Sequence, residues 1–176
     1  MKQITKFFIS AAVMLAFPVA TYAQTNIAQA TATATIVTPI TIVRSTNMSF
    51  GNVIQTVVTN PSTVTIDPVT GLASYSNATA SLTPAATAAI TAATYTVTGT
   101  PGAAYAITLP GTVTLTGPSG ATMTATNFSS DLTSPGALGS PVGTQALSVG
   151  ARLNIAASQA AGTYISGNFD VTVNYN

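Results

Sequence analysis

The sequence predicts an all-β protein, an antiparallel sandwich or barrel built from short strands. Three observations lead to this fold class. Threonine, which fits a pleated surface as valine does, is the commonest residue after residue 23, and valine, glycine and proline recur along the chain with it. Glutamate and lysine, the usual helix formers on a protein surface, are absent from that part. Many short runs alternate apolar and polar residues, and turn-forming residues separate them.

The first 23 residues are typical of a secretory signal peptide, expected as a helix before the domain. Lys2 and Lys6 precede an apolar run from Phe7 to Phe17, and Ala23 closes a small-residue cleavage site. The run is shorter than the roughly 20 apolar residues of a membrane-spanning helix. We therefore expect residues 24–176 to be one exported domain without a transmembrane segment, in the periplasm, on the outer cell surface or outside the cell.

The expected mature chain is nearly uncharged. Three aspartates and two arginines, Asp67, Asp131, Asp170, Arg44 and Arg152, give it a net charge of −1. With so little positive charge, nucleic acid and anionic membranes are not expected as partners. Low charge favours association between copies, whereas a shell of threonine and asparagine would keep a monomer soluble, so charge alone leaves both alternatives open.

Ten short segments are candidate strands, and turn residues connect them. Pro68 after Asp67, with Gly71 free to adopt a positive φ, predicts a tight hairpin, and Pro118 with Gly120 predicts another. The candidates are Thr31–Val37, Ile40–Val43, Thr63–Ile66, Leu72–Tyr75, Thr94–Thr98, Tyr105–Leu109, Val113–Thr116, Thr122–Phe128, Ala146–Ile155 and Phe169–Tyr175.

Two segments between the candidate strands are expected to be irregular. Residues 129–144 are expected to form a surface loop, and the alanine-rich residues 78–93 a loop with one short helical turn.

The motif T-x-T recurs in four places, at residues 31–35, 94–98, 112–116 and 122–126. Threonine is both β-branched and polar, so the simplest interpretation is the solvent face of ordinary strands. The alternative is a flat array of hydroxyls and methyls that orders water or ice. Such an array needs ladders in register, and the uneven spacing of the runs is unfavourable for it.

The expected mature chain contains no His, Cys, Lys or Glu, and its aspartates are far apart in sequence. Zinc sites need His or Cys ligands, a nucleophilic Ser or Thr needs a base, and calcium needs clustered acidic residues. Asp67 belongs to a turn, Asp131 to a loop and Asp170 to the polar face of the last strand. We therefore expect no enzyme activity, no cofactor and no metal.

Arg152 lies in a long candidate strand with strict alternation. Its apolar neighbours in sequence share one face, which leaves Arg152 on the opposite, solvated face. A pair with Asp170 is expected only if the last two strands are neighbours, and it contributes little if exposed.

The order of several short motifs resembles the DUF4402 family of exported bacterial proteins, over nearly the whole mature chain. The family has no established activity, so the resemblance implies no catalytic residues. The motifs are A-T-A-x-I-V-x-P-I-T-I (32–42), M-S-F-G (48–51), Y-x-V-T-G (95–99), I-T-L-P (107–110), L-S-V-G-A-R-L (147–153) and G-T-Y-x-S-G-x-F-x-V-T-V-N-Y (162–175).

The last residues also resemble the chaperone–usher pilins, including those related to spore coat protein U. Such pilins are immunoglobulin-like sandwiches completed by an N-terminal segment of the next subunit. Their final strand alternates apolar residues, ends on a next-to-last aromatic residue and follows a glycine. The matching residues here are Gly162, Phe169, Val171, Val173 and Tyr175.

The resemblance implies an immunoglobulin-like sandwich in which residues 24–37 are either a donated strand, with Ile27 and Ile36 as contact residues, or the chain's own first strand. The spore coat U group carries cysteines, which this chain lacks, and alanines are small side chains for filling a groove.

The sequence thus predicts a non-enzymatic surface structural protein, a fimbria-like or coat-like subunit that assembles by strand addition. Its expected partners are further copies, other surface subunits and a periplasmic chaperone. The alternative is a monomeric module that binds a glycan or another surface ligand. Tyr75 and Tyr105 lie near loops and would be its stacking residues if their rings are exposed. Burial of both rings would exclude this alternative.

Overall fold

The computed structural model describes residues 26–55, 59–76, 82–84 and 89–176. The predicted signal peptide, residues 1–23, lies outside the described residues. The chain divides into two units, one up to Thr35 and one comprising Ile36–Asn176. In the first unit, residues 26–35 are exposed chain without regular secondary structure.

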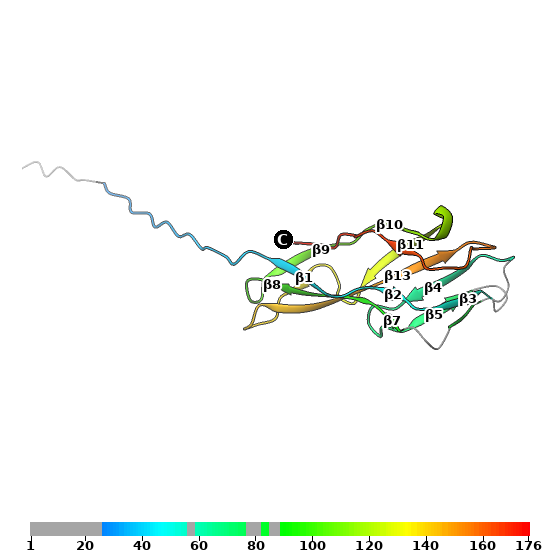
Figure 1. Cartoon of the computed structure of the whole chain (residues 1–176). Helices are drawn as coiled ribbons and strands as arrows, with labels where there is room; N and C mark the ends of the chain where they lie inside the picture. The colour runs from blue at the N-terminus through cyan, green and yellow to red at the C-terminus, as the bar shows by residue number, and fades with distance from the viewer. Residues whose placement is uncertain (1–25, 56–58, 77–81, 85–88) are drawn as a thin grey trace, which may run out of the picture. The chain divides into compact units, whose positions relative to one another are not determined.

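The second unit is all-β in its described residues, which confirms the predicted antiparallel fold class (Figure 1). Its main sheet has eight strands in the order β1-β8-β13-β11-β10-β14, and the β4–β5 hairpin pairs with β13. The bounds are β1 Thr41–Thr46, β4 Ser62–Ile66, β5 Ala73–Ser76, β8 Ala93–Thr98, β10 Thr112–Thr116, β11 Thr122–Ser130, β13 Thr144–Ile155 and β14 Ile165–Ser166.

A second sheet has the order β12-β9-β15. It consists of β12 Gly136–Ala137, β9 Ala104–Thr108 and the C-terminal β15 Thr172–Tyr175. Two further strand pairs are short: β2 Ser49–Phe50 with β7 Ile90–Thr91, and β3 Val53–Gln55 with β6 Leu82–Pro84. All of these pairings are antiparallel.

The core consists of two apolar clusters. The larger one is contributed by β8 and β13 of the main sheet and by β9 and β15 of the second sheet, with Tyr105 and Val97 fully buried. The smaller one contains Val64, Leu153 and Ile155 from β4 and β13. Alternation places these side chains on one face of each strand, and each fully buried aliphatic side chain contributes about 1.5–3 kcal/mol relative to exposure.

The predicted hairpin at Asp67 is confirmed in detail. The Asp67 carboxylate accepts hydrogen bonds from the backbone N–H groups of Val69 and Thr70, at 2.7 and 3.1 Å. Gly71 has a φ of 68° and donates its N–H to the Asp67 carbonyl. The second predicted turn contains a 3-10 segment, Pro118–Gly120, in which Gly120 has a φ of 78°.

Three predictions of local structure are wrong. Residues 31–37 form no strand, because no described segment pairs with them, and the first strand begins after Pro39, which has no N–H to donate. Residues 129–144 are not a plain loop, since β11 continues to Ser130 and β12 lies within them. The 78–93 segment is not irregular throughout, since strands β6 and β7 lie within it. The structure does not test the predicted helical turn there, because residues 78–81 and 85–88 lie outside the described chain.

The predicted strand faces around Arg152 are confirmed. Leu147, Val149, Ala151, Leu153 and Ile155 are all buried, and Arg152 is exposed on the other face. The condition for a pair with Asp170 is not met, because β13 and β15 belong to different sheets and Asp170 precedes β15.

The outer face of the main sheet has threonine ladders that are in register, contrary to what their sequence spacing indicated. Thr114, Thr124, Asn154 and Thr63 align across four strands. The next row contains Thr112, Thr126, Arg152, Thr65 and Ser74. Arg152 thus puts a long charged side chain in the middle of this row, which interrupts the flat array that ice binding requires.

Candidate functional site

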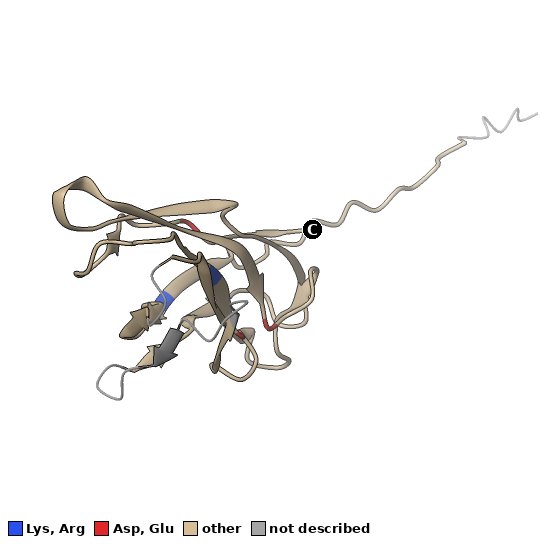
Figure 2. Cartoon of the chain, turned by 90° about the vertical axis from the view of Figure 1, so that its right-hand side faces the viewer, with Lys and Arg blue, Asp and Glu red and all other residues tan. Residues whose placement is uncertain are grey.

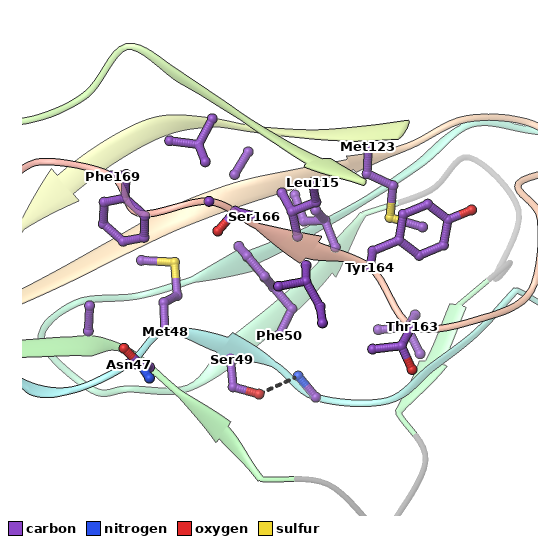
Figure 3. A pocket seen from close by; sticks show the side chains of 18 of the residues that line it. Asn47, Met48, Ser49, Phe50, Leu115, Met123, Thr163, Tyr164, Ser166 and Phe169 are labelled. Atoms are coloured by element: carbon purple, nitrogen blue, oxygen red, sulfur yellow. Dashed lines mark hydrogen bonds between the residues drawn. The ribbon is translucent and has the colours of Figure 1, made fainter. Parts of the chain in front are cut away.

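The main feature of the second unit is a cleft of about 1300 Å³. Its floor is the inner face of the main sheet, where Leu115, Met123, Leu153 and Ile155 contribute apolar side chains. One wall is the chain from Asn47 to Gln55, and the other is the chain from Gln159 to Val171. Figure 3 shows Met123 and Tyr164 at one end of this cleft and Met48 and Phe169 toward the other.

The first wall contributes Met48 and Phe50 around strand β2. Ser49, between them, accepts a hydrogen bond from the Gly51 N–H at 3.2 Å through its side-chain oxygen (Figure 3). Gly51 has a φ of 69°, which turns the chain from β2 toward β3. Met48 directly precedes β2 and is two residues before Phe50. In extended chain this spacing places both side chains on the same side, and both line the cleft.

The second wall is fixed to the main sheet at several points. β14 pairs with β10, and the Phe169 ring packs on Phe128 with ring centroids 5.5 Å apart. The Tyr164 hydroxyl donates to the Ala160 carbonyl and accepts from the Gln159 side chain, at 2.8 and 2.7 Å. These contacts hold the wall in place although only β14 within it is a strand.

Three strands beside or within the walls have an unpaired edge. β1, at the edge of the main sheet, pairs with β8 on one side, and β15, at the edge of the second sheet, pairs with β9 on one side. β14, in the second wall, pairs only with β10. Within the described ranges, no strand is paired with the other side of any of the three. Such edges present unpaired N–H and C=O groups, which are a template for an added strand.

The chain's C-terminus is held by a contact outside the cleft. The Tyr175 hydroxyl donates to the Thr38 carbonyl and accepts from the Thr100 N–H, each at 2.7 Å. The Thr38 N–H in turn donates to the Thr100 hydroxyl at 3.1 Å. Gly99 leaves room for this contact, since a Cβ there would overlap the Tyr175 hydroxyl. We call Thr38, Thr100 and Tyr175 the terminal clamp.

Charge is sparse throughout the described chain (Figure 2), and the cleft is lined by only two charged residues, Arg44 and Asp170. Burial raises the pKa of Tyr95, which lies on the floor, and the nearby Arg44 lowers it by a smaller amount. Among the described residues, no three His, Cys, Asp or Glu lie together as a metal site needs. The cleft is thus lined mainly by uncharged groups, with apolar side chains on the floor and both apolar and neutral polar side chains along the walls.

The structure separates the residues predicted from the C-terminal motif. Gly162, Phe169 and Val171 line the cleft. Val171 is also buried in the larger core cluster together with Val173, which does not line the cleft. Tyr175 lies outside the cleft in the terminal clamp.

The two N-terminal residues of the predicted site, Ile27 and Ile36, are 76% and 99% exposed. Ile36, which belongs to the second unit, is not among the residues that line its cleft.

Sequence reasoning missed the floor and the first wall of the cleft. Met48, Phe50, Leu115 and Met123 belong to segments far apart in sequence, and only strand pairing brings them together. The alternation of Met48 and Phe50 within M-S-F-G was the one local signal available.

The two tyrosines named for a glycan site are not exposed stacking platforms. Tyr105 is fully buried in the larger core cluster, and Tyr75 is partly buried against the smaller one. The hydroxyl oxygens of both are buried as well.

A family model described as a domain of unknown function, DUF4402, matches residues 40–175. The chain belongs to the DUF4402 family. This confirms the family resemblance seen in the motifs. No curated protein and no solved structure matches this DUF4402 chain. The matched region contains both cleft walls and Tyr175, and it begins after Thr38 and the segment before it.

In the part of this DUF4402 chain that the structure describes, no helix has the length and apolar character needed to cross a membrane.

Proposed function

We propose that this protein is an exported, non-enzymatic structural subunit of a bacterial surface, fimbria-like, which assembles when its cleft receives a strand from another chain. The observation that carries the proposal is the cleft of about 1300 Å³, whose floor is lined by apolar side chains of the sheet's inner face. An apolar groove beside unpaired strand edges is suited to strand addition, in which backbone hydrogen bonds give affinity and alternate side chains give specificity.

Two features of the sequence support the same role. The first residues are typical of a signal peptide, which would bring the chain to the periplasm or the cell surface. The expected mature chain lacks His, Cys, Lys and Glu and therefore has few groups for acid–base or metal chemistry. In the structure, Met48, Phe50 and Phe169 give the cleft walls apolar surface, which suits a protein partner.

The expected partners follow from the same cleft. Further copies or other surface subunits would supply the strand, and a periplasmic chaperone would cover the apolar floor before assembly. The alternative of a monomeric glycan-binding module has less support, because Tyr105 is fully buried and Tyr75 is partly buried. The cleft's remaining rings, such as Phe50 and Phe169, are only partly exposed.

Size-exclusion chromatography with light scattering tests the proposal. The mature chain from Gln24 onward is compared over a range of concentrations with a form that lacks Gln24–Val37. We expect oligomers or polymers from the full form and only monomers, free or chaperone-dependent, from the shortened form. A full form that remains monomeric at every concentration and with a co-expressed chaperone would refute the proposal.

A further inference from the structure

We propose that the strand received by the cleft is residues 28–36 of a second copy, inserted with its even-numbered side chains toward the floor. This inference rests on the proposed function and identifies the partner segment and its orientation. Four observations carry it: the alternation in the segment, the size of the side chains that line the cleft, the absence of charge, and the terminal clamp.

The segment before the clamp has the two-residue period of a strand but is not one in its own chain. Its even positions are Ala28, Ala30, Ala32, Ala34 and Ile36, all apolar, and its odd positions between them are Gln29, Thr31, Thr33 and Thr35, all polar. The described residues 26–37 are exposed and lie outside every strand. An alternating segment without a partner sheet is suited to pairing with the edge of another.

The size of the even side chains fits the cleft. Several lining residues are large and apolar, namely Met48, Phe50, Met123 and Phe169, so the acceptor itself supplies apolar bulk. Methyl side chains would let a strand backbone come close to these residues and to the unpaired strand edges beside the cleft, where larger side chains would be crowded. Alanine side chains are small for filling a groove, but beside these large lining residues their size suits the cleft.

Charge and polarity agree with this orientation. Residues 26–37 contain no charged side chain, so insertion would bury none. The odd-numbered threonines would face outward and form the polar, solvent-facing side of the inserted strand.

The terminal clamp favours a second copy over the chain's own segment. Both backbone groups of Thr38 are engaged, the N–H by the Thr100 hydroxyl and the carbonyl by Tyr175. Pro39 follows, with its φ fixed and no N–H to donate. To enter its own cleft, the chain would have to reverse at these residues and break the clamp, whereas a segment from another copy enters without this cost.

A pair of aspartate variants tests the orientation. Ala32→Asp and Thr33→Asp add the same charge at neighbouring positions that are both exposed in the free chain. We expect Ala32→Asp to raise the protein concentration needed for assembly at least about tenfold, because it would bury a carboxylate, and Thr33→Asp to change it less than about threefold. Unfolding curves of both monomers should coincide with that of the wild type, since neither residue lies in a strand.

The outcomes separate this inference from the proposed function. If the wild type assembles and the two aspartate variants lose assembly equally, or not at all, the orientation is refuted while strand addition stands. If the wild type assembles without dependence on residues 24–37, the segment is refuted as the inserted strand. If the wild type never assembles, the proposed function fails first. Ala32→Leu and Thr33→Leu repeat the comparison without charge, and only the even-numbered change should weaken assembly.

Discussion

At the scale of single residues, Tyr175 shows how one side chain joins distant parts of the chain. Its ring packs against the larger core cluster, and its hydroxyl bridges the carbonyl before Pro39 and the amide after Gly99. The alternation of the last residues predicted Tyr175 as part of an apolar strand face. It did not predict the partners of the hydroxyl, because Thr38 and Thr100 come together through the pairing of β1 with β8, and Tyr175 is positioned by the pairing of β15 with β9.

Tyr175→Phe should destabilise the protein by about 1–3 kcal/mol, because it leaves the Thr38 carbonyl and the Thr100 N–H without this partner. Urea unfolding of the mature chain, followed by circular dichroism, measures the loss. Asn174→Ala, at an exposed position on the same strand, is the matched control and should lie within about 0.5 kcal/mol of the wild type. A Tyr175→Phe curve that overlays the wild-type curve would show that the clamp contributes no stability.

Tyr105→Phe, unlike Tyr175→Phe, should have little effect on the free energy of unfolding. The Tyr105 hydroxyl is buried and makes no hydrogen bond within the described residues. Removing it should change the free energy of unfolding by less than about 1 kcal/mol at neutral pH.

The same tyrosine predicts an alkaline loss of stability. Burial, and secondly the charge of Asp131, raise the pKa of Tyr105 above its ordinary value of 10.0. Above pH 10 the unfolded tyrosine ionises while the folded one stays protonated, so the folded state binds more protons and stability falls as the pH rises. Below that pH the contribution is fully present. Urea midpoints at pH 7 to 11 should fall less steeply for Tyr105→Phe, and identical slopes would contradict this assignment.

At the scale of elements, the turns were predictable because their chemistry is local. Asp67, Pro68 and Gly71 specify the β4–β5 hairpin through bonds that span only a few residues. The segment 31–37 has the same kind of strand pattern as β8 but forms no strand, since a strand also needs an edge to pair with. Alternation therefore predicted which segments are able to pair, and not which of them pair within one chain.

Asp67→Ala should destabilise the hairpin by about 1 kcal/mol, because the N–H groups of Val69 and Thr70 lose their acceptor. Asp67→Asn keeps a side-chain oxygen at the same place and should retain most of the stability. Thermal unfolding of the two variants beside the wild type gives the comparison. Equal losses for both would mean that the charge of Asp67, and not its hydrogen bonds, supports the turn.

At the scale of the whole molecule, the fold class and the alternating C-terminal strand were predictable, and the cleft was not. The cleft depends on which strand edges stay unpaired and on where Leu115, Met123 and Phe50 meet, and these are properties of the sheet topology. Of the residues predicted for assembly, Phe169, Val171 and Gly162 line the cleft, while Val173 belongs to the core. In the assembled protein, we infer, another copy fills the cleft.

Disulfide trapping between copies tests this claim most directly, because the chain has no cysteine of its own. A copy with Ala32→Cys is mixed with a copy with Met123→Cys under mild oxidation, and a control mixture uses Thr33→Cys in place of Ala32→Cys. A parallel series mixes Met123→Cys with Ala30→Cys or Ala34→Cys, with Thr31→Cys and Thr35→Cys as the controls. We expect a disulfide-linked pair of the two variants from at least one even-numbered position and from no odd-numbered one. Linked pairs from odd and even positions alike, or from neither, would contradict the account.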